Sequence, residues 1–388
     1  MISRIQKAIH VNYSFRNINI SSFLRFCATM FVFLLHGRTY ISNIESASTA
    51  LQWITMLPAW AGVWIFVFLS GYGIGMGFFK NKYVFLNTER HINWKQLIPF
   101  YIRRFLKLAP LYYLYCIVYE FVSGNYYFWN DHHNLIKMLT FRFNGAGGHA
   151  YMGHLWYVST AMQLYLIIPF LCLLLRYLKT IQMNTLGLLL VSLLGLFTRI
   201  SLTHAALDWY TYIYTSFLPN LDLIICGVIT AHIVCMVENT SCQTRWPKSI
   251  SLLLFFLLVG YNCYIYYLNL SVCLYIYRII LPSIYITVCA LLVISWQQCN
   301  ISKNAFTLSN ICTPLAIFFD WFAKYSYGFY VFHILILHYL ADTLAQTAFY
   351  IQASPYVQYI TFFGLGFAIT LFFSCSFTQI VSLKTRGV

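Results

Sequence analysis

The chain has 388 residues, of which 60% are hydrophobic, 20% are aromatic and only 9% are charged. Soluble globular domains carry about 25% charged residues, so this composition excludes that class. The formal net charge of +15 does not indicate a nucleic-acid partner, because the basic residues are scattered between apolar segments, as in the cytoplasmic loops of membrane proteins.

Apolar segments of about 20 residues recur along the chain, and each is long enough to cross a bilayer as an α-helix. We expect an all-α, polytopic transmembrane bundle that forms one domain over residues 1–388. The third segment is interrupted by Pro110, and the fifth is short. The ten expected spans lie near residues 20–37, 57–79, 99–122, 154–177, 184–203, 211–236, 250–269, 272–295, 314–340 and 357–382.

The lysines and arginines predict the orientation of this bundle. With the N-terminus in the cytoplasm, 18 of the 24 lie in cytoplasmic segments, and only Arg38, Lys137 and Arg142 lie in external ones. Cytoplasmic loops of membrane proteins carry such an excess, so we expect both termini in the cytoplasm. The basic N-terminus and first apolar run resemble a signal peptide, but the run contains Arg25 and no A-x-A cleavage site follows. We therefore expect an uncleaved first helix.

The cysteines and a glycine-rich stretch do not indicate a metal site, a disulfide framework or a phosphate-binding loop. None of the twelve cysteines forms a C-x-x-C pair, so we interpret them as small buried hydrophobes and expect neither a zinc site nor a disulfide framework. The NGAGGH stretch in the long external loop, about 123–153, lacks the G-K-[ST] ending of a phosphate loop. We interpret it as a flexible loop.

The first predicted helix carries two polar residues in the stretch FLRFCATMFVFLLHGR. Arg25 and His36 are eleven residues apart, which is about 20° from three full helical turns, so they share a face about 16 Å apart along the axis. With the N-terminus inside, Arg25 lies toward the cytoplasm and His36 toward the outer face. Snorkelling or a helix end explains either residue alone, but the pair on one face favours a functional site.

The second and third helices add glycines and a basic cluster. GVWIFVFLSGYGIG predicts close helix packing through small residues. YIRRFLKLAPLYY places Arg103, Arg104 and Lys107 at the cytoplasmic end of the third helix. This cluster is either an ordinary positive flank or an anion clamp for a cytosolic ligand that carries phosphate.

Histidines occur in two later helices. GHLWYVSTAMQLYLIIP begins at the outer surface and puts His154 at about the depth of His36. KYSYGFYVFH begins at the inner surface and places Ser326 and His333 seven residues apart, on one helix face.

Taken together, these stretches resemble the acyltransferase-3 family of integral membrane acyltransferases. Six motifs follow the family's order along most of the chain: R-x(10)-H, IFVFLSGY, the basic RR segment with its proline, HLWYVS with Q-x-Y, NLDLIICG and YSYGFYVFH. The matching residues are Arg25, His36, Ser70, Gly71, Arg103, Arg104, Lys107, Pro110, Tyr112, His154, Leu155, Trp156, Ser159, Gln163, Tyr165, Asp222, Gly227, Ser326, Tyr327, Tyr330 and His333.

The resemblance implies an O-acyltransferase that moves an acyl group, usually acetyl, from cytosolic acyl-CoA to a hydroxyl within or beyond the membrane. Typical acceptors are sugars of surface polysaccharides or their lipid-linked precursors, which places the protein in a bacterial inner membrane. Acyl-CoA would be a co-substrate, and the resemblance implies no bound cofactor and no metal.

The resemblance also distributes roles among the polar residues. A sugar hydroxyl needs a base during attack, and histidine suits this task near neutral pH, so we expect His36 to be the general base. Arg25 would lie along the passage and meet an anionic or carbonyl group of the donor. The expected donor-binding residues are Arg103, Arg104, Lys107 and Ser70. The expected acceptor-side or supporting residues are His154, Trp156, Tyr327 and His333.

Two residues depart from the family pattern. Lys107 stands where the family usually has arginine, which keeps the charge but loses the bidentate fork. Ala161 stands where many members have glutamate, so we assign no catalytic carboxylate. An acyl-enzyme route is disfavoured, because no local pattern places a serine or cysteine beside His36.

Two alternative functions remain open from the sequence. A transporter or flippase for a glycan or lipid precursor would also have many helices and intramembrane charges, although no internal repeat is visible. A membrane acyltransferase that acts on a small lipid or a peptide is the second alternative.

Overall fold

The computed structural model describes residues 18–41, 51, 59–86, 92–124, 126–142, 152–205, 208–240, 247–268, 276–298 and 309–385. These residues are almost entirely helical, and the β contact among them is an isolated bridge between Leu86 and Ile92. The expected all-α class is confirmed. The NGAGGH stretch lies outside the described residues.

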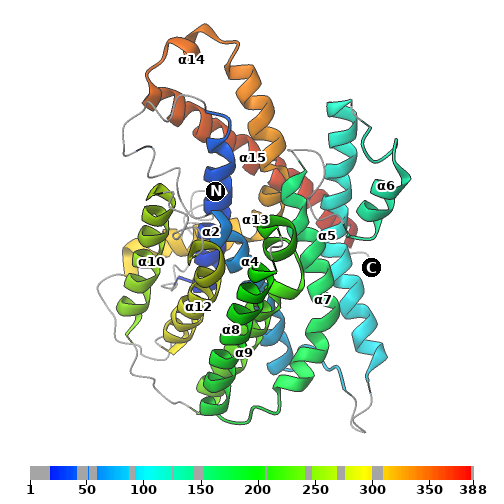
Figure 1. The fold of residues 1–388 in the computed structure, drawn as a ribbon, viewed down its shortest axis with the longest axis vertical. Coiled ribbons are helices and arrows are strands. Elements are labelled where there is room, and N and C mark those ends of the chain that lie inside the picture. The colour runs from blue at the N-terminus through cyan, green and yellow to red at the C-terminus, as the bar shows by residue number, and fades with distance from the viewer. Residues whose placement is uncertain are drawn as a thin grey trace, which may run out of the picture.

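The described residues form ten long helices, and short helical segments connect some of them. Figure 1 shows how these helices pack into a bundle. The long helices are α2 (Ile20–Arg38), α4 (Ala59–Phe79), α5 (Trp94–Ser123), α7 (Trp156–Leu175), α8 (Ile181–His204), α9 (Leu221–Thr240), α10 (Lys248–Leu268), α12 (Leu281–Gln298), α13 (Ser309–Leu344) and α15 (Pro355–Thr385). The short segments are α6 (His132–Leu139), η2 (Gly153–Leu155), η3 (Trp209–Tyr214), η4 (Leu218–Asn220), η5 (Ile276–Ile280) and α14 (Ala348–Gln352).

Nine helices in the described part of the chain are long and apolar enough to cross a membrane, and they correspond to nine of the ten expected spans. The remaining expected span, 314–340, lies within α13. This helix has 36 residues, which is more than a bilayer requires, and it contains Asp320, Lys324 and His333.

Two expectations about individual helices are wrong. α5 is not interrupted at Pro110 but continues through it for 30 residues, because membrane helices tolerate proline where neighbouring groups satisfy the freed backbone. The fifth span is not short, since α8 has 24 residues. Its N-terminus is fixed by Thr180, whose Oγ1 accepts a 3.1 Å hydrogen bond from the Met183 amide.

The sixth span is divided in a way that apolar periodicity did not predict. Residues 209–214 form a separate π-helical segment, and α9 begins only at Leu221. A 3₁₀ turn that contains Pro219 connects the two, and Asn220 fixes this turn by donating to the carbonyl oxygens of Tyr214 and Ser216 at 2.8 and 2.7 Å.

Helices α4 and α9 pack closely through glycine. A Cβ atom on Gly71 would collide with the Ile224 carbonyl oxygen, and one on Gly227 would collide with that of Phe68. The expected packing through small residues is therefore confirmed. It brings the backbones of α4 and α9 together at the centre of the bundle, where α4 also contacts α2.

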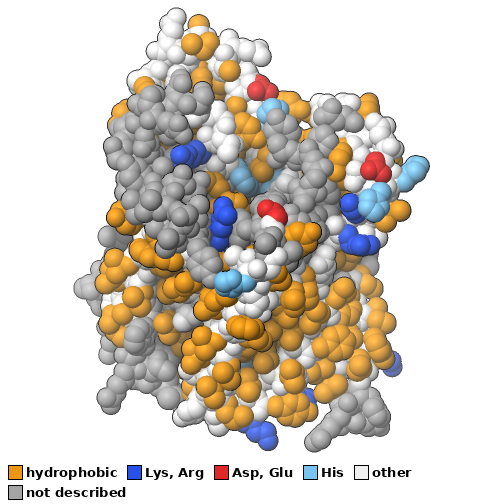
Figure 2. Space-filling model, in the orientation of Figure 1, with side chains coloured by type: hydrophobic (Ala, Val, Ile, Leu, Met, Phe, Trp, Pro, Cys, Tyr) orange, Lys and Arg blue, Asp and Glu red, His pale blue; other side chains and the backbone are white. Residues whose placement is uncertain are grey.

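The outward face of α8 is apolar, as a bilayer-facing surface requires. Leu186, Leu190, Leu194 and Phe197 recur at helical spacing, and all are exposed. Figure 2 shows hydrophobic side chains gathered over α7 and α8, with Lys and Arg at the edges of this area. The arrangement supports an integral membrane protein.

Candidate active site

The first part of the site is a cavity of about 250 Å³ enclosed by α2, α4, α5, α7 and α13. It lies toward the end of the bundle where α2 begins, which the expected orientation places in the cytoplasm, and we call it the inner cavity. Its polar lining residues are Arg25, Ser70, Arg104, Lys107, Tyr157, Tyr165, Ser326, Tyr327 and Tyr330.

Three cations give the inner cavity its charge. Arg25, Arg104 and Lys107 come from two different helices, and no carboxylate belongs to the described residues that line the cavity. The Arg25 guanidinium has no hydrogen bond or ion pair with another described residue. A partly enclosed site with uncompensated positive charge is suited to an anionic ligand.

Aromatic side chains fix the position of Arg104. Its Nη2 donates to the Tyr83 hydroxyl at 2.8 Å, and its guanidinium lies 5.2 Å from the ring centre of Phe100 and 5.7 Å from that of Tyr165. These cation–π contacts hold the side chain in the cavity wall. The Tyr165 hydroxyl in turn donates to Ser70 Oγ at 3.4 Å.

Lys107 belongs to the inner cavity, whereas the neighbouring Arg103 does not. Lys107 is exposed and lines two hollows, one of which is the inner cavity. Arg103 is exposed on the outside of α5, where its Nε donates to the Pro99 carbonyl oxygen at 3.1 Å. The structure therefore brings together Arg104 and Lys107 of the predicted basic cluster and separates Arg103 from them.

A second cavity of about 400 Å³ lies near the C-terminal end of α2, and we call it the outer cavity. His36, His154 and Trp156 line it. Trp156 is only 3% exposed and packs edge-on against Tyr214, with ring centres 4.5 Å apart. It is thus a buried wall of the cavity and not part of an interfacial aromatic belt.

Three histidines from different segments meet beside the outer cavity. His36 of α2 lies beside His333 of α13, with ring centres 5.0 Å apart and planes inclined by only 14°. The ring centre of His154, from η2, lies 5.3 Å from that of His333. The sequence placed His36 and His154 at similar depth, and the structure adds His333 to the same group.

The hydrogen bonds of this group determine the tautomer of His36. His333 Nδ1 lies 2.6 Å from the Tyr330 carbonyl oxygen, which can only accept, so Nδ1 carries the proton. In a neutral ring His333 Nε2 is then an acceptor, and it lies 2.7 Å from His36 Nδ1. His36 therefore donates through Nδ1, and its Nε2 keeps a lone pair. This is the form that a general base requires.

His154 and Tyr330 support this arrangement. The His154 Nε2 lies 2.9 Å from the Val331 carbonyl oxygen and donates to it, and the Tyr330 hydroxyl donates to the His154 carbonyl oxygen. Both contacts connect η2 to α13 next to His333.

Tyr330 also lies between the two cavities, since it belongs to the walls of both. The site assignment from sequence missed it. Its spacing of three residues from His333, on one helix face, was the signal that could have identified it.

Tyr327 belongs to the inner cavity and not to the outer side. Its hydroxyl donates to the Leu108 carbonyl oxygen at 2.7 Å, which connects α13 to α5. Of the expected acceptor-side or supporting residues, only His154, Trp156 and His333 therefore lie beside the outer cavity.

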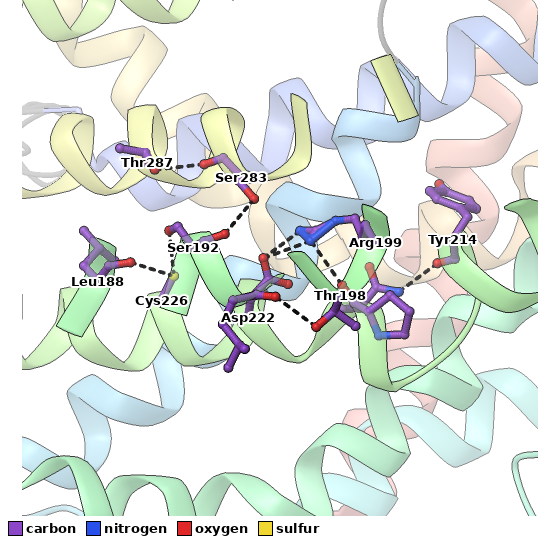
Figure 3. Close-up of polar contacts among 12 residues, drawn as sticks. Leu188, Ser192, Thr198, Arg199, Tyr214, Asp222, Cys226, Ser283 and Thr287 are labelled. Atoms are coloured by element: carbon purple, nitrogen blue, oxygen red, sulfur yellow. Dashed lines mark hydrogen bonds and ion pairs between the residues drawn. The ribbon is translucent and has the colours of Figure 1, made fainter. Parts of the chain in front are cut away.

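Figure 3 shows a buried ion pair between α8 and α9. Neither of its residues lines the inner or the outer cavity. Asp222 Oδ2 accepts from Arg199 Nη2 at 2.6 Å and from Nη1 at 3.0 Å, and both side chains are less than 5% exposed. Asp222 lies in the first turn of α9, where the helix dipole favours a negative charge. The aspartate of the NLDLIICG segment thus connects α8 to α9 and lines neither cavity.

Comparison with known proteins gives one match. A family model described as an acyltransferase domain, Acyl_transf_3, matches residues 18–379 and so includes every residue of both cavities. No curated protein and no solved structure matches the chain. The family match covers nearly the whole sequence, and we conclude that the chain belongs to the acyltransferase-3 family of integral membrane acyltransferases.

Proposed function

We propose that this protein transfers an acyl group, acetyl in the simplest case, from cytosolic acyl-CoA to a hydroxyl of a surface polysaccharide or its lipid-linked sugar precursor in a bacterial inner membrane. One observation carries the proposal: a cationic inner cavity and a histidine-lined outer cavity share the wall residue Tyr330. A donor and an acceptor that arrive from opposite sides would meet beside this residue.

The inner cavity has the charge that an acyl-CoA donor needs. Arg104 and Lys107 would contact its phosphates, and charge-assisted contacts of this kind are among the strongest hydrogen bonds in proteins. Arg25 and His36 are eleven residues apart on α2, or about 16 Å along the axis. Arg25 would therefore hold the donor along the passage and would not reach the reacting carbonyl beside His36.

The reaction would begin when His36 Nε2 removes the proton of the acceptor hydroxyl. The oxygen attacks the thioester carbonyl carbon and forms a C–O bond, and the tetrahedral oxyanion then collapses with cleavage of the C–S bond. The CoA thiolate leaves with the electron pair and takes the proton from the His36 imidazolium, so no net proton is consumed. His333 would stabilise the imidazolium form by accepting from Nδ1 throughout.

The outer cavity suits a sugar acceptor. Trp156 forms a buried aromatic wall, and the edge of Tyr214 adjoins it. An aromatic wall can pack against the C–H face of a sugar ring, while the imidazoles of His36 and His154 provide polar contacts for hydroxyl groups.

The test compares the surface glycan of cells that contain the gene, lack it, or carry His36→Gln, by mass spectrometry. We expect acyl-substituted sugars only with the wild-type gene, and we expect the purified protein to release CoA from acetyl-CoA when acceptor is added. A transporter would release no CoA. An identical glycan in all three strains, together with no CoA release, would contradict the proposal.

A further inference from the structure

A third hollow, of about 710 Å³, lies between α5, α13 and α15, and we call it the lateral groove. α13 and α15 touch at Gly328, where a Cβ atom would lie only 2.6 Å from Ser374 Oγ. The same hydroxyl donates to the Tyr325 carbonyl oxygen at 2.6 Å. Lys324, one turn before Gly328 on α13, and Thr378, one turn after Ser374 on α15, line the groove. The groove therefore opens next to a tight helix crossing.

The lateral groove is positively charged. Arg103, Lys107 and Lys324 line it, and no acidic side chain belongs to the described residues of its wall. The nearest acid on the same helix, Asp320, lies one turn before Lys324 and accepts a 2.8 Å hydrogen bond from Ser22 of α2. The Asp320 carboxylate thus contacts α2 and does not line the groove, so the ligand that fits the groove is an anion.

The lateral groove also has the surface properties of a lipid-facing site. Its remaining wall is mostly apolar, with Ile102, Leu106, Leu111 and Val381 among its members. Ile102 is half exposed on α5, and the neighbouring Ile98 and Phe105 are similarly exposed. The inner cavity, in contrast, is enclosed by five helices. An anion that fits the lateral groove must therefore carry apolar chains.

We propose that the lateral groove binds an anionic phospholipid. The phosphate would lie between Arg103 and Lys324, and an acyl chain would follow the apolar wall formed by Ile102, Leu106 and Leu111. Basic hollows between transmembrane helices are suited to anionic lipid headgroups. Arg103, which lies outside the inner cavity, would thus bind the lipid phosphate and not the acyl donor.

The bound lipid would contact the wall of the inner cavity, because Lys107 and Tyr327 line both hollows. Tyr327 donates to the Leu108 carbonyl oxygen and so forms a hydrogen-bonded partition between them. An acyl-CoA molecule also has phosphates and an apolar chain, but it reaches the protein from the aqueous phase, whereas this groove faces the bilayer. The two ligands should therefore not compete.

The experiment measures lipid retention by native mass spectrometry after purification from nanodiscs that contain equal amounts of phosphatidylglycerol and phosphatidylcholine. The wild-type protein should retain phosphatidylglycerol preferentially. Arg103→Gln/Lys324→Gln should reduce this preference by about tenfold or more, since it removes two charge-assisted contacts. Leu106→Trp, which fills the groove without changing its charge, should also reduce retention. Arg176→Gln/Lys179→Gln removes the same charge at the end of α7 and should retain lipid normally.

Three results would overturn the proposal. In the first, the groove variants retain as much phosphatidylglycerol as the wild type. In the second, the control variant loses as much lipid as the Arg103/Lys324 variant, so the preference reflects overall charge. In the third, excess acetyl-CoA displaces the lipid, so the groove belongs to the donor. Thermal unfolding of each variant establishes that it is folded, and the assay does not depend on transfer activity.

Discussion

His36 Nδ1 on α2 lies 2.7 Å from His333 Nε2 on α13, although the two residues are 297 positions apart in the sequence. Because His333 is itself oriented by the Tyr330 carbonyl oxygen, this contact leaves the lone pair of His36 on Nε2. His333 is therefore a positioning residue in the proposed reaction.

Replacing His333 separates this role from simple packing. His333→Met keeps a side chain of similar size but offers His36 only a weak acceptor. We expect single-turnover transfer to fall by about tenfold or more, which is a part of the 10²–10⁴-fold that a general base contributes. His333→Gln should restore part of the rate, because its amide oxygen can accept from Nδ1. Donor affinity should change little in either variant. Equal rates for Met and Gln would show that the hydrogen bond has no part in transfer.

The cations of the inner cavity should determine donor affinity. Arg104→Ala is expected to weaken acyl-CoA binding by about 1.5–3 kcal/mol, because a charge-assisted phosphate contact is lost. Lys107→Arg should preserve or strengthen binding, since a guanidinium can contact phosphate through two N–H groups. Isothermal titration with acetyl-CoA measures both effects, and Arg176→Ala serves as a control. If Arg104→Ala bound the donor normally, the basic cluster would be only a topology signal.

The buried ion pair between Arg199 and Asp222 predicts an asymmetric effect on stability. Asp222→Ala should lower the free energy of unfolding by about 3–5 kcal/mol, because it leaves the arginine charge buried without its carboxylate. Arg199→Met/Asp222→Leu should recover most of this loss, since no charge remains. Denaturation in detergent measures both variants. If Asp222→Ala were as stable as the wild type, the charge of Arg199 would be compensated by water or headgroups and not by Asp222.

The distribution of lysine and arginine also predicts the orientation of the protein in the membrane. A C-terminal reporter that is active only outside the cytoplasm should give no signal, and the same reporter inserted after Arg142, beyond the end of α6, should give a strong one. Activity of the C-terminal fusion would reverse the sides from which donor and acceptor are proposed to arrive.

The sequence was sufficient to predict where the helices lie and which residues share one face of a helix. Composition and apolar length predicted the ten long helices of the described residues, and helical geometry placed Arg25 and His36 on one face of α2. The separation of Arg103 from Arg104 follows from the same geometry, because consecutive side chains on a helix point about 100° apart. The sequence alone therefore contained the reason to divide the basic cluster.

The remainder of the site depends on packing between helices. The contact between His36 and His333 exists because α2 and α13 pack together, and periodicity within one helix carries no information about its neighbours. The continuation of α5 through Pro110 depends likewise on its surroundings, which a local rule for proline does not include.

The most direct test of the account is single-turnover acyl transfer by His36→Ala, measured beside acyl-CoA affinity on folded protein. The proposed base acts in the transition state and lies about 16 Å along α2 from the donor-side Arg25, so transfer should fall by about 10²–10⁴-fold while donor affinity remains nearly unchanged. Near-normal transfer by His36→Ala would contradict the central claim that His36 is the base. Loss of donor affinity together with transfer would place His36 in the donor passage instead.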